Sequence, residues 1–154
     1  MEPIFQHAWV LFIASTCVNA AVWWFRGRHA RDARPELRDS YVALIKGFLF
    51  WANLPWFVLG LFVLTGALRS TFEIMDLRSG NRYVQSWVAL VVLLWLLCTR
   101  WLFSGGAQLL VDHPGLLNLN NPTPHKIKLL WLACLAGGVA GFLMLYLNLP
   151  SRAA

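Results

Sequence analysis

Acidic residues are scarce in this sequence, and none of them lies inside its long apolar runs. Only 13% of the residues are charged, against roughly a quarter in a typical soluble domain. Proton-coupled carriers usually place a carboxylate within the membrane as the exchanging group. The lack of such a carboxylate disfavours a four-span exporter of that kind.

Paired cysteines are also missing. Cys17, Cys98 and Cys134 stand far apart and form no C-x-x-C motif, which argues against a disulfide framework or a thiol relay. The chain likewise offers no close pair of carboxylates, no nucleophile beside a base and no glycine-rich phosphate loop. We therefore expect no catalytic residues and no enzymatic activity.

Histidines are few and lie at or beyond the ends of the apolar runs. Haem bound inside a helical bundle needs axial ligands that project from the spans themselves, so a cytochrome is disfavoured. A metal site can be drawn from His29, Asp112 and His113, but no two of these residues have the sequence spacing of metal ligands. We expect that no metal and no cofactor binds and that the histidines are solvated loop residues. They are His7, His29, His113 and His125.

Apolar residues, by contrast, are abundant and make up 58% of the chain. They gather in four runs, at residues 8–25, 47–68, 87–103 and 129–149. Each run is near the ~20 residues that a helix needs to cross ~30 Å of hydrocarbon. This pattern predicts an all-α, integral membrane four-helix bundle that forms a single membrane domain over residues 1–154.

Basic residues are distributed unequally between the two sides of these runs. Nine of the 13 Lys and Arg residues fall in the first and third connections, and four fall on the opposite side. Cytoplasmic connections carry the excess of Lys and Arg. We therefore predict a bacterial inner (plasma) membrane protein with both termini outside the cytoplasm and a basic cytoplasmic loop.

The connections contain recognisable helix signals. Pro35 suits a first helical turn, so the second helix should begin near it and run through Lys46 into the bilayer. Ser70 and Glu73 have the spacing of a capping box and predict a short interfacial helix between spans 2 and 3. The third helix should continue to about Val111 and break before Pro114.

Tryptophans near the span ends fit the aromatic belts at membrane interfaces and need no cofactor to explain them. This group comprises Trp9, Trp23, Trp24, Trp87, Trp101 and Trp131.

A few polar residues interrupt the spans. Asn19, Asn53 and Arg100 could meet at one depth in the cytoplasmic half of the bundle, and Ser15 shares a helical face with Asn19. Pro55 removes one helical hydrogen bond and is predicted to form a hinge whose freed carbonyl needs a partner. The cluster is either structural or a polar pathway, and the sequence leaves both interpretations open.

The fourth run carries small residues four apart: Ala133, Gly137 and Gly141. Small residues let helix backbones approach closely where lipid supplies no hydrophobic drive. We predict a helix-packing face, whose partner is either another helix of this chain or a second copy.

The first connection is rich in arginine: Arg26, Arg28, Arg31, Arg34 and Arg38. These residues could bind anionic lipid headgroups or the acidic face of a partner, or could serve only to orient the chain. They do not indicate a nucleic-acid partner.

Together these features predict an interaction or accessory subunit of a membrane assembly, which contacts the lipid bilayer and associates with itself or with a larger membrane protein. The alternative is a small oligomeric channel or transporter in which polar residues of spans 1–3 line a passage.

Overall fold

The computed structural model describes residues 6–148, and within that range the chain is helical or irregular, without a strand. Residue 149, where the fourth predicted span ends, and Arg152 lie outside the described residues. The helices are α2 (Trp9–Arg26), α3 (Arg28–Ala33), η1 (Pro35–Leu37), α4 (Arg38–Leu64), η2 (Thr71–Met75), α5 (Arg82–Trp101), η3 (Leu102–Gly106), α6 (Ala107–Asp112) and α7 (Pro124–Asn148).

Four helical stretches are long and apolar enough to cross a membrane. They are Trp9–Arg26, Pro35–Leu64, Arg82–Asp112 and Pro124–Leu147. Each contains most of one predicted apolar run, so the prediction of four long apolar helices is confirmed. The second and third stretches extend well beyond the apolar runs, because polar residues continue both helices past their apolar parts.

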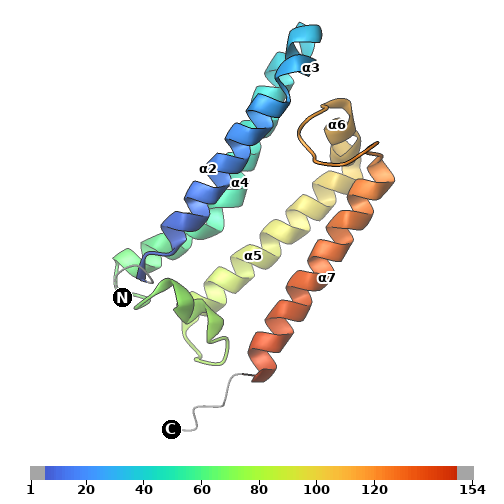
Figure 1. Ribbon diagram of the computed structural model, residues 1–154. Helices are drawn as coiled ribbons and strands as arrows, with labels where there is room; N and C mark the ends of the chain where they lie inside the picture. The colour runs from blue at the N-terminus through green and yellow to red at the C-terminus, as the bar shows by residue number, and fades with distance from the viewer. Residues whose placement is uncertain (1–5, 149–154) are drawn as a thin grey trace.

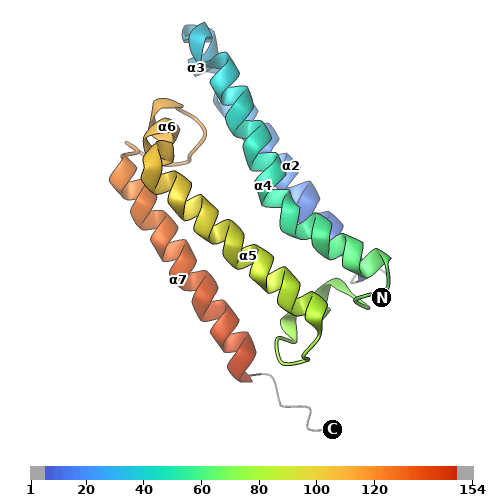
Figure 2. The same cartoon turned by 180° about the vertical axis from the view of Figure 1, so that it is seen from behind.

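The four long helices form two antiparallel pairs, α2 beside α4 and α5 beside α7 (Figure 1). The view from behind shows the same pairing (Figure 2). The start of α2, η2 and the end of α7 lie at one end of the molecule, which we call the η2 end. The opposite end carries α3 and α6, and we call it the α6 end.

Helix α4 begins as predicted. Pro35 opens the 3₁₀ turn η1, and α4 then runs from Arg38 to Leu64 with Pro55 inside it. The sequence placed the end of this span at residue 68, four residues too late. Gly66 has φ +74°, a left-handed conformation that ends helices and favours glycine, and it follows the C-cap residue Thr65.

The short helix predicted between spans 2 and 3 is present as the 3₁₀ helix η2, but the capping box does not form. The Ser70 side chain makes no cap hydrogen bond. The Glu73 carboxylate instead accepts from the backbone N–H of Arg69 at 2.7 Å and from the Asn81 amide at 3.3 Å. Asn81 is itself the N-cap of α5, because its Oδ1 accepts from the Tyr83 N–H. The Glu73 carboxylate therefore links the beginning and the end of the segment between α4 and α5.

The third long helix continues to Asp112, as predicted, but it is bent. A π-helical turn, η3, separates α5 from α6, with non-helical dihedral angles at Ser104 and at Gly105, whose φ is +115°. Such turns insert an extra residue into the helical ladder and redirect the chain that follows. The bend carries α6 and the loop after it toward the pair of α2 and α4 (Figure 1).

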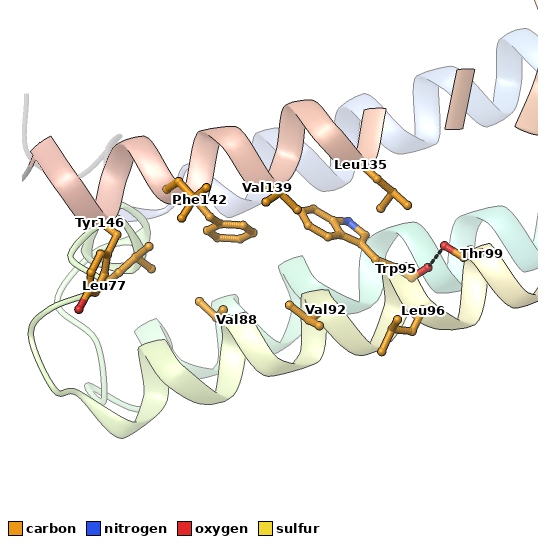
Figure 3. A pocket seen from close by; sticks show the side chains of 11 residues that line it. Leu77, Val88, Val92, Trp95, Leu96, Thr99, Leu135, Val139, Phe142 and Tyr146 are labelled. Atoms are coloured by element: carbon orange, nitrogen blue, oxygen red, sulfur yellow. Dashed lines mark hydrogen bonds between the residues drawn. The ribbon is translucent and has the colours of Figure 1, made fainter. Parts of the chain in front are cut away.

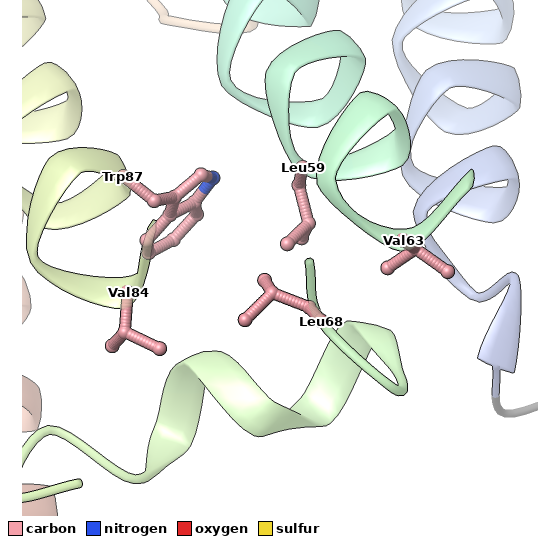
Figure 4. Packing of buried hydrophobic residues seen from close by; sticks show 5 residues of the cluster. All are labelled: Leu59, Val63, Leu68, Val84 and Trp87. Carbon is pink, nitrogen blue, oxygen red and sulfur yellow. The ribbon is translucent and has the colours of Figure 1, made fainter. Parts of the chain in front are cut away.

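Buried apolar side chains form three clusters instead of one central core. At the η2 end, Leu59, Val63, Leu68, Val84 and Trp87 join α4 to α5 (Figure 4). The second cluster, at the α6 end, joins α2 and α4 to Leu116, and the third joins η3 and α6 to α7 through Ile127. Trp87, which was predicted to lie near a span end, packs between these helices and is only 7% exposed.

Candidate functional site

A buried polar region lies at the α6 end, where the loop after α6 meets the pair of α2 and α4. Tyr41 is completely buried there, and its hydroxyl donates a 2.7 Å hydrogen bond to the carbonyl of Pro114. Leu116, 1% exposed, packs beside it against Ala20 and Ile45. We call Arg31, Tyr41 and His113, which surround this contact, the buried polar cluster.

Two glycines allow this close approach. A Cβ on Gly27 would lie 2.9 Å from Tyr41 Cε1 and 3.1 Å from Arg31 Nη1. A Cβ on Gly115 would lie 2.8 Å from the Arg26 carbonyl oxygen, and the φ of Gly115 is +91°. A larger residue at Gly115 would push the loop away from the end of α2, and one at Gly27 would displace Tyr41 or Arg31.

Arg31 is the buried cation of the cluster, with 8% of its surface exposed. Its guanidinium carbon lies 3.7 Å from the centre of the Trp24 ring and 5.6 Å from the centre of the Tyr41 ring. Ring faces attract cations through their quadrupole, and this attraction offsets part of the cost of desolvating the guanidinium. Among residues 6–148, its Nη1 atom has no hydrogen-bond partner. Arg31 is therefore not available at the surface as the sequence had predicted.

His113 is buried as well, at 2% exposure, so the prediction that it is a solvated loop histidine is wrong. Its Nδ1 lies 2.6 Å from the Leu109 carbonyl oxygen, which makes Nδ1–H the donor, and Nε2 has no partner in the described part of the chain. Its ring meets Tyr41 edge to face at 4.7 Å between centroids. The local pattern His-Pro-Gly indicated a turn but not that the turn docks on another helix.

A metal site does not assemble from the residues considered for one. Among the described residues, no group of three His, Cys, Asp or Glu side chains could hold an ion. The Asp112 carboxylate accepts a hydrogen bond from the Gln108 amide, and His29 Nε2 accepts one from Arg28 Nε at 3.4 Å.

The remaining arginines of the first connection fall into two groups. Arg26 reaches across to the loop after α6 and donates to the Leu117 carbonyl at 3.2 Å and to Asn118 Oδ1 at 2.9 Å. Arg28, Arg34 and Arg38 have exposed side chains. These three remain the candidates for lipid headgroups or for an acidic partner.

The structure does not join the residues of the predicted intramembrane cluster to one another. Asn53 is 3% exposed; its Nδ2 donates to the Leu49 carbonyl of its own helix at 2.8 Å, and no described residue pairs with its Oδ1. Ser15, Asn19 and Arg100 are exposed. Within the described part of the chain, no hydrogen bond joins any of these four residues to another.

The hinge predicted at Pro55 does not end the helix, because α4 continues for nine residues beyond it to Leu64. The carbonyl of Pro55 accepts a 3.0 Å hydrogen bond from Trp87 Nε1 on α5. The carbonyl that Pro55 frees lies four residues earlier, at Trp51, so the indole bond goes to a different carbonyl from the one predicted to need a partner. The bond ties the two pairs of helices together at the η2 end.

The predicted packing face of α7 points away from the rest of the described chain. Ala133, Gly137 and Gly141 are exposed, and no atom lies within 4 Å of a Cβ built on either glycine. Gly138 makes the contact within the chain instead, because its Cβ would lie 2.6 Å from the Trp95 ring on α5. The run Ala-Gly-Gly thus places small residues on two faces, and the sequence alone did not show which face meets α5.

An apolar groove runs between α5 and α7, with a volume of about 530 Å³. Figure 3 shows side chains from both helices directed into it, with Trp95 reaching across toward Val139. Its lining is Leu77, Val88, Val92, Trp95, Leu96, Thr99, Leu135, Val139, Phe142, Leu143 and Tyr146. Near Thr99 a hydrogen bond joins the two helices, since Trp131 Nε1 donates to the Thr99 hydroxyl at 2.8 Å.

Comparison with protein-family models, with curated proteins and with solved structures found no match to this chain.

Proposed function

We propose that the protein is an integral membrane subunit without catalytic activity of its own, which assembles with itself or with a larger membrane protein. Its contact surface would be the glycine face of α7, formed by Ala133, Gly137 and Gly141, together with the exposed arginines of the first connection. One observation supports this proposal above the others. From residue 128 to residue 147, no side chain of α7 is buried in the described chain.

The position of the glycine face strengthens this argument. Residues two apart on a helix lie about 200° apart around its axis, so Val139 faces the opposite direction from Gly137 and Gly141. Val139 lines the groove toward α5. The glycine face is therefore directed outward, where close backbone approach by another helix meets no side chain of this chain.

The proposed setting is the bacterial inner membrane, with both termini outside the cytoplasm. The excess of Lys and Arg in the first and third connections supports this orientation. Both connections belong to the α6 end, and the start of α2 and the end of α7 share the η2 end (Figure 1). The α6 end would then face the cytoplasm.

The alternative of a channel or transporter has less support. A passage through one copy would need polar side chains directed between the helices. Ser15, Asn19 and Arg100 are exposed, and the Asn53 amide bonds to its own helix. Only an oligomer could bring these side chains together around a passage.

Purification of the tagged full-length chain in mild detergent tests the proposal. We expect the wild type to form an oligomer by light scattering or to retain a larger membrane protein. Gly141→Leu should release that association, because the added side chain blocks close approach. Gly47→Leu is the matched control, since a Cβ on Gly47 also meets no atom within 4 Å but lies on α4. A wild-type monomer without a retained partner, or equal association in both variants, would contradict the proposal.

A further inference from the structure

A short loop joins the two pairs of helices at the α6 end (Figure 1). Residues 113–118 accept hydrogen bonds from Tyr41 and Arg26 of the first pair, and they supply Leu116 to the apolar cluster at that end. We call this contact the α6 joint. Because Trp87 joins the pairs separately at the η2 end, a change within this loop can part them at the α6 end alone.

His113 is a titratable side chain buried inside the α6 joint. Its Nδ1–H donates to the Leu109 carbonyl, so the neutral ring leaves Nε2 as an acceptor. No residue among 6–148 pairs with this Nε2. Histidine is the side chain that gains its charge within the physiological pH range. Protonation would therefore bury a charged N–H group without an acceptor, which costs far more than burying a neutral ring nitrogen.

The two side chains that meet His113 across the joint do not offset such a charge. From α4, Tyr41 meets it ring to ring, and the Tyr41 hydroxyl already donates to the Pro114 carbonyl. From α3, the Arg31 guanidinium lies 5.6 Å from the centre of the same tyrosine ring. An aromatic ring attracts a cation. A charged His113 would, however, be the second cation at this ring and would be repelled by the first.

The other charged groups of the surrounding elements are bound elsewhere or exposed. Arg26 of α2 bonds to the loop itself, and Lys126 of α7 donates to a loop carbonyl. The Asp112 carboxylate of α6 is exposed and accepts from Gln108. Within the described part of the chain, no carboxylate forms an ion pair with His113. On α3, η1, α4 and the residue between α3 and η1, the exposed charged side chains are Arg28, Asp32, Arg34, Glu36, Arg38 and Asp39.

We propose that the α6 joint is a proton-sensitive contact, which is closed while His113 is neutral and opens when His113 is protonated. In the open state water reaches the ring, so this state binds the proton more readily than the closed state does. A fall in pH shifts a population toward the state that binds more protons. The pairs then part at the α6 end and remain joined at the η2 end. The inference is independent of the proposed assembly, because the joint lies within one copy of the chain.

Distances between spin labels in the full-length chain test this proposal, measured in detergent by double electron–electron resonance. Labels at Arg38 of α4 and Leu129 of α7 report on the α6 end, and labels at Leu64 of α4 and Leu147 of α7 report on the η2 end. All four side chains are exposed and lie outside the joint. The native cysteines are replaced with alanine so that only the introduced cysteines carry labels; they are Cys17, Cys98 and Cys134.

We expect one distance at the α6 end at about pH 8 and a second, longer distance at about pH 5, whereas the distance at the η2 end stays constant. The ratio of open to closed molecules should rise by up to about tenfold for each unit that the pH falls, which is the limit for one proton.

Two variants separate His113 from other titrating groups. His113→Phe keeps an aromatic ring against Tyr41 but cannot gain a charge, so it should stay closed at both pH values. His113→Lys carries a charge throughout and should be open at both, and an unchanged distance at the η2 end shows that it is folded. A wild type that keeps its α6-end distance on acidification would overturn the proposal, as would a His113→Phe variant that opens to the same extent. A change at both ends would also overturn it, because the chain would then unfold as a whole.

Discussion

Two buried polar side chains near Pro55 use their hydrogen bonds in different ways. The Asn53 amide donates to Leu49 in its own helix and leaves Oδ1 unpaired. The Trp87 indole donates across to the Pro55 carbonyl and so joins α5 to α4. A buried polar atom without a partner costs stability, whereas an interhelical bond contributes to it. Of the two residues, Trp87 is therefore the one that holds helices together in the isolated chain.

Replacing Asn53 with leucine should consequently not weaken the isolated chain. We expect Asn53→Leu to raise the free energy of unfolding by about 1 kcal/mol, because it removes an unsatisfied amide oxygen from a buried position. Thermal unfolding in detergent, followed by circular dichroism, measures this change.

The control is Asn19→Leu, whose side chain is exposed and whose effect should stay within about 0.5 kcal/mol. A clear loss of stability in Asn53→Leu alone would show that Oδ1 has a partner which the described chain does not supply, as an oligomer or a polar pathway would provide.

At the scale of elements, the sequence predicted the helices well because their signals are local. Apolar length indicated the four long helices, and Pro35 and Pro114 marked the beginning of one and the break after another. The end of α4 was missed because Gly66 terminates it within a run that is still apolar. The capping box at Ser70 was also misjudged, since Glu73 accepts from the neighbouring N–H group instead.

The candidate site was less predictable, because it depends on which faces meet. Periodicity identified small residues on α7 but could not distinguish Gly137 from Gly138, the glycine that contacts Trp95. The burial of His113 requires the loop after α6 to reach Tyr41, and the two residues are far apart in the sequence. Gly27, beside a helix end, and Gly115, in the loop, were the local signs that two segments approach closely there.

The hydroxyl of Thr99 takes part in the hydrogen bond that joins α5 to α7. Thr99 donates to the Trp95 carbonyl and accepts from Trp131, so Thr99→Val would leave the indole N–H unpaired. We expect the free energy of unfolding to fall by about 1 kcal/mol, near the upper range for such bonds between membrane helices. Denaturant titration in mixed micelles measures the loss.

Thr16→Val provides the comparison, because the Thr16 hydroxyl also donates to the carbonyl four residues earlier but accepts no bond from another helix. This variant should differ from the wild type by only a few tenths of a kcal/mol. If both valine variants lose the same stability, the Trp131 bond contributes nothing to the pairing of α5 with α7.

For the whole molecule, the two pairs of helices are joined mainly near their ends. Trp87 and its cluster connect them at the η2 end, and Leu116 connects them at the α6 end. The η2 end and the α6 end would face opposite sides of a membrane. The orientation of the chain therefore determines which of these two clusters lies on the cytoplasmic side.

Topology reporters test this orientation directly. A reporter that is active only outside the cytoplasm should work when inserted near residue 75 and fail near residues 32 and 120, because basic connections are retained inside. A reporter active only in the cytoplasm should give the opposite result at the same three positions. Activity outside the cytoplasm at residue 32 would reverse the proposed orientation and assign the buried polar cluster to the outer surface.

The hydrogen bond from Tyr41 to Pro114 can form only late in the synthesis of the chain. Its partners are 73 residues apart in the chain. At a synthesis rate of 5 to 20 residues per second, roughly 4 to 15 s pass between the appearance of the tyrosine and that of the proline. The first pair of helices is completed within this interval, when α4 reaches Leu64, and Tyr41 then still lacks its contact with Pro114. A chaperone or lipid headgroup that shields this end would have to act within those seconds and leave before the loop arrives.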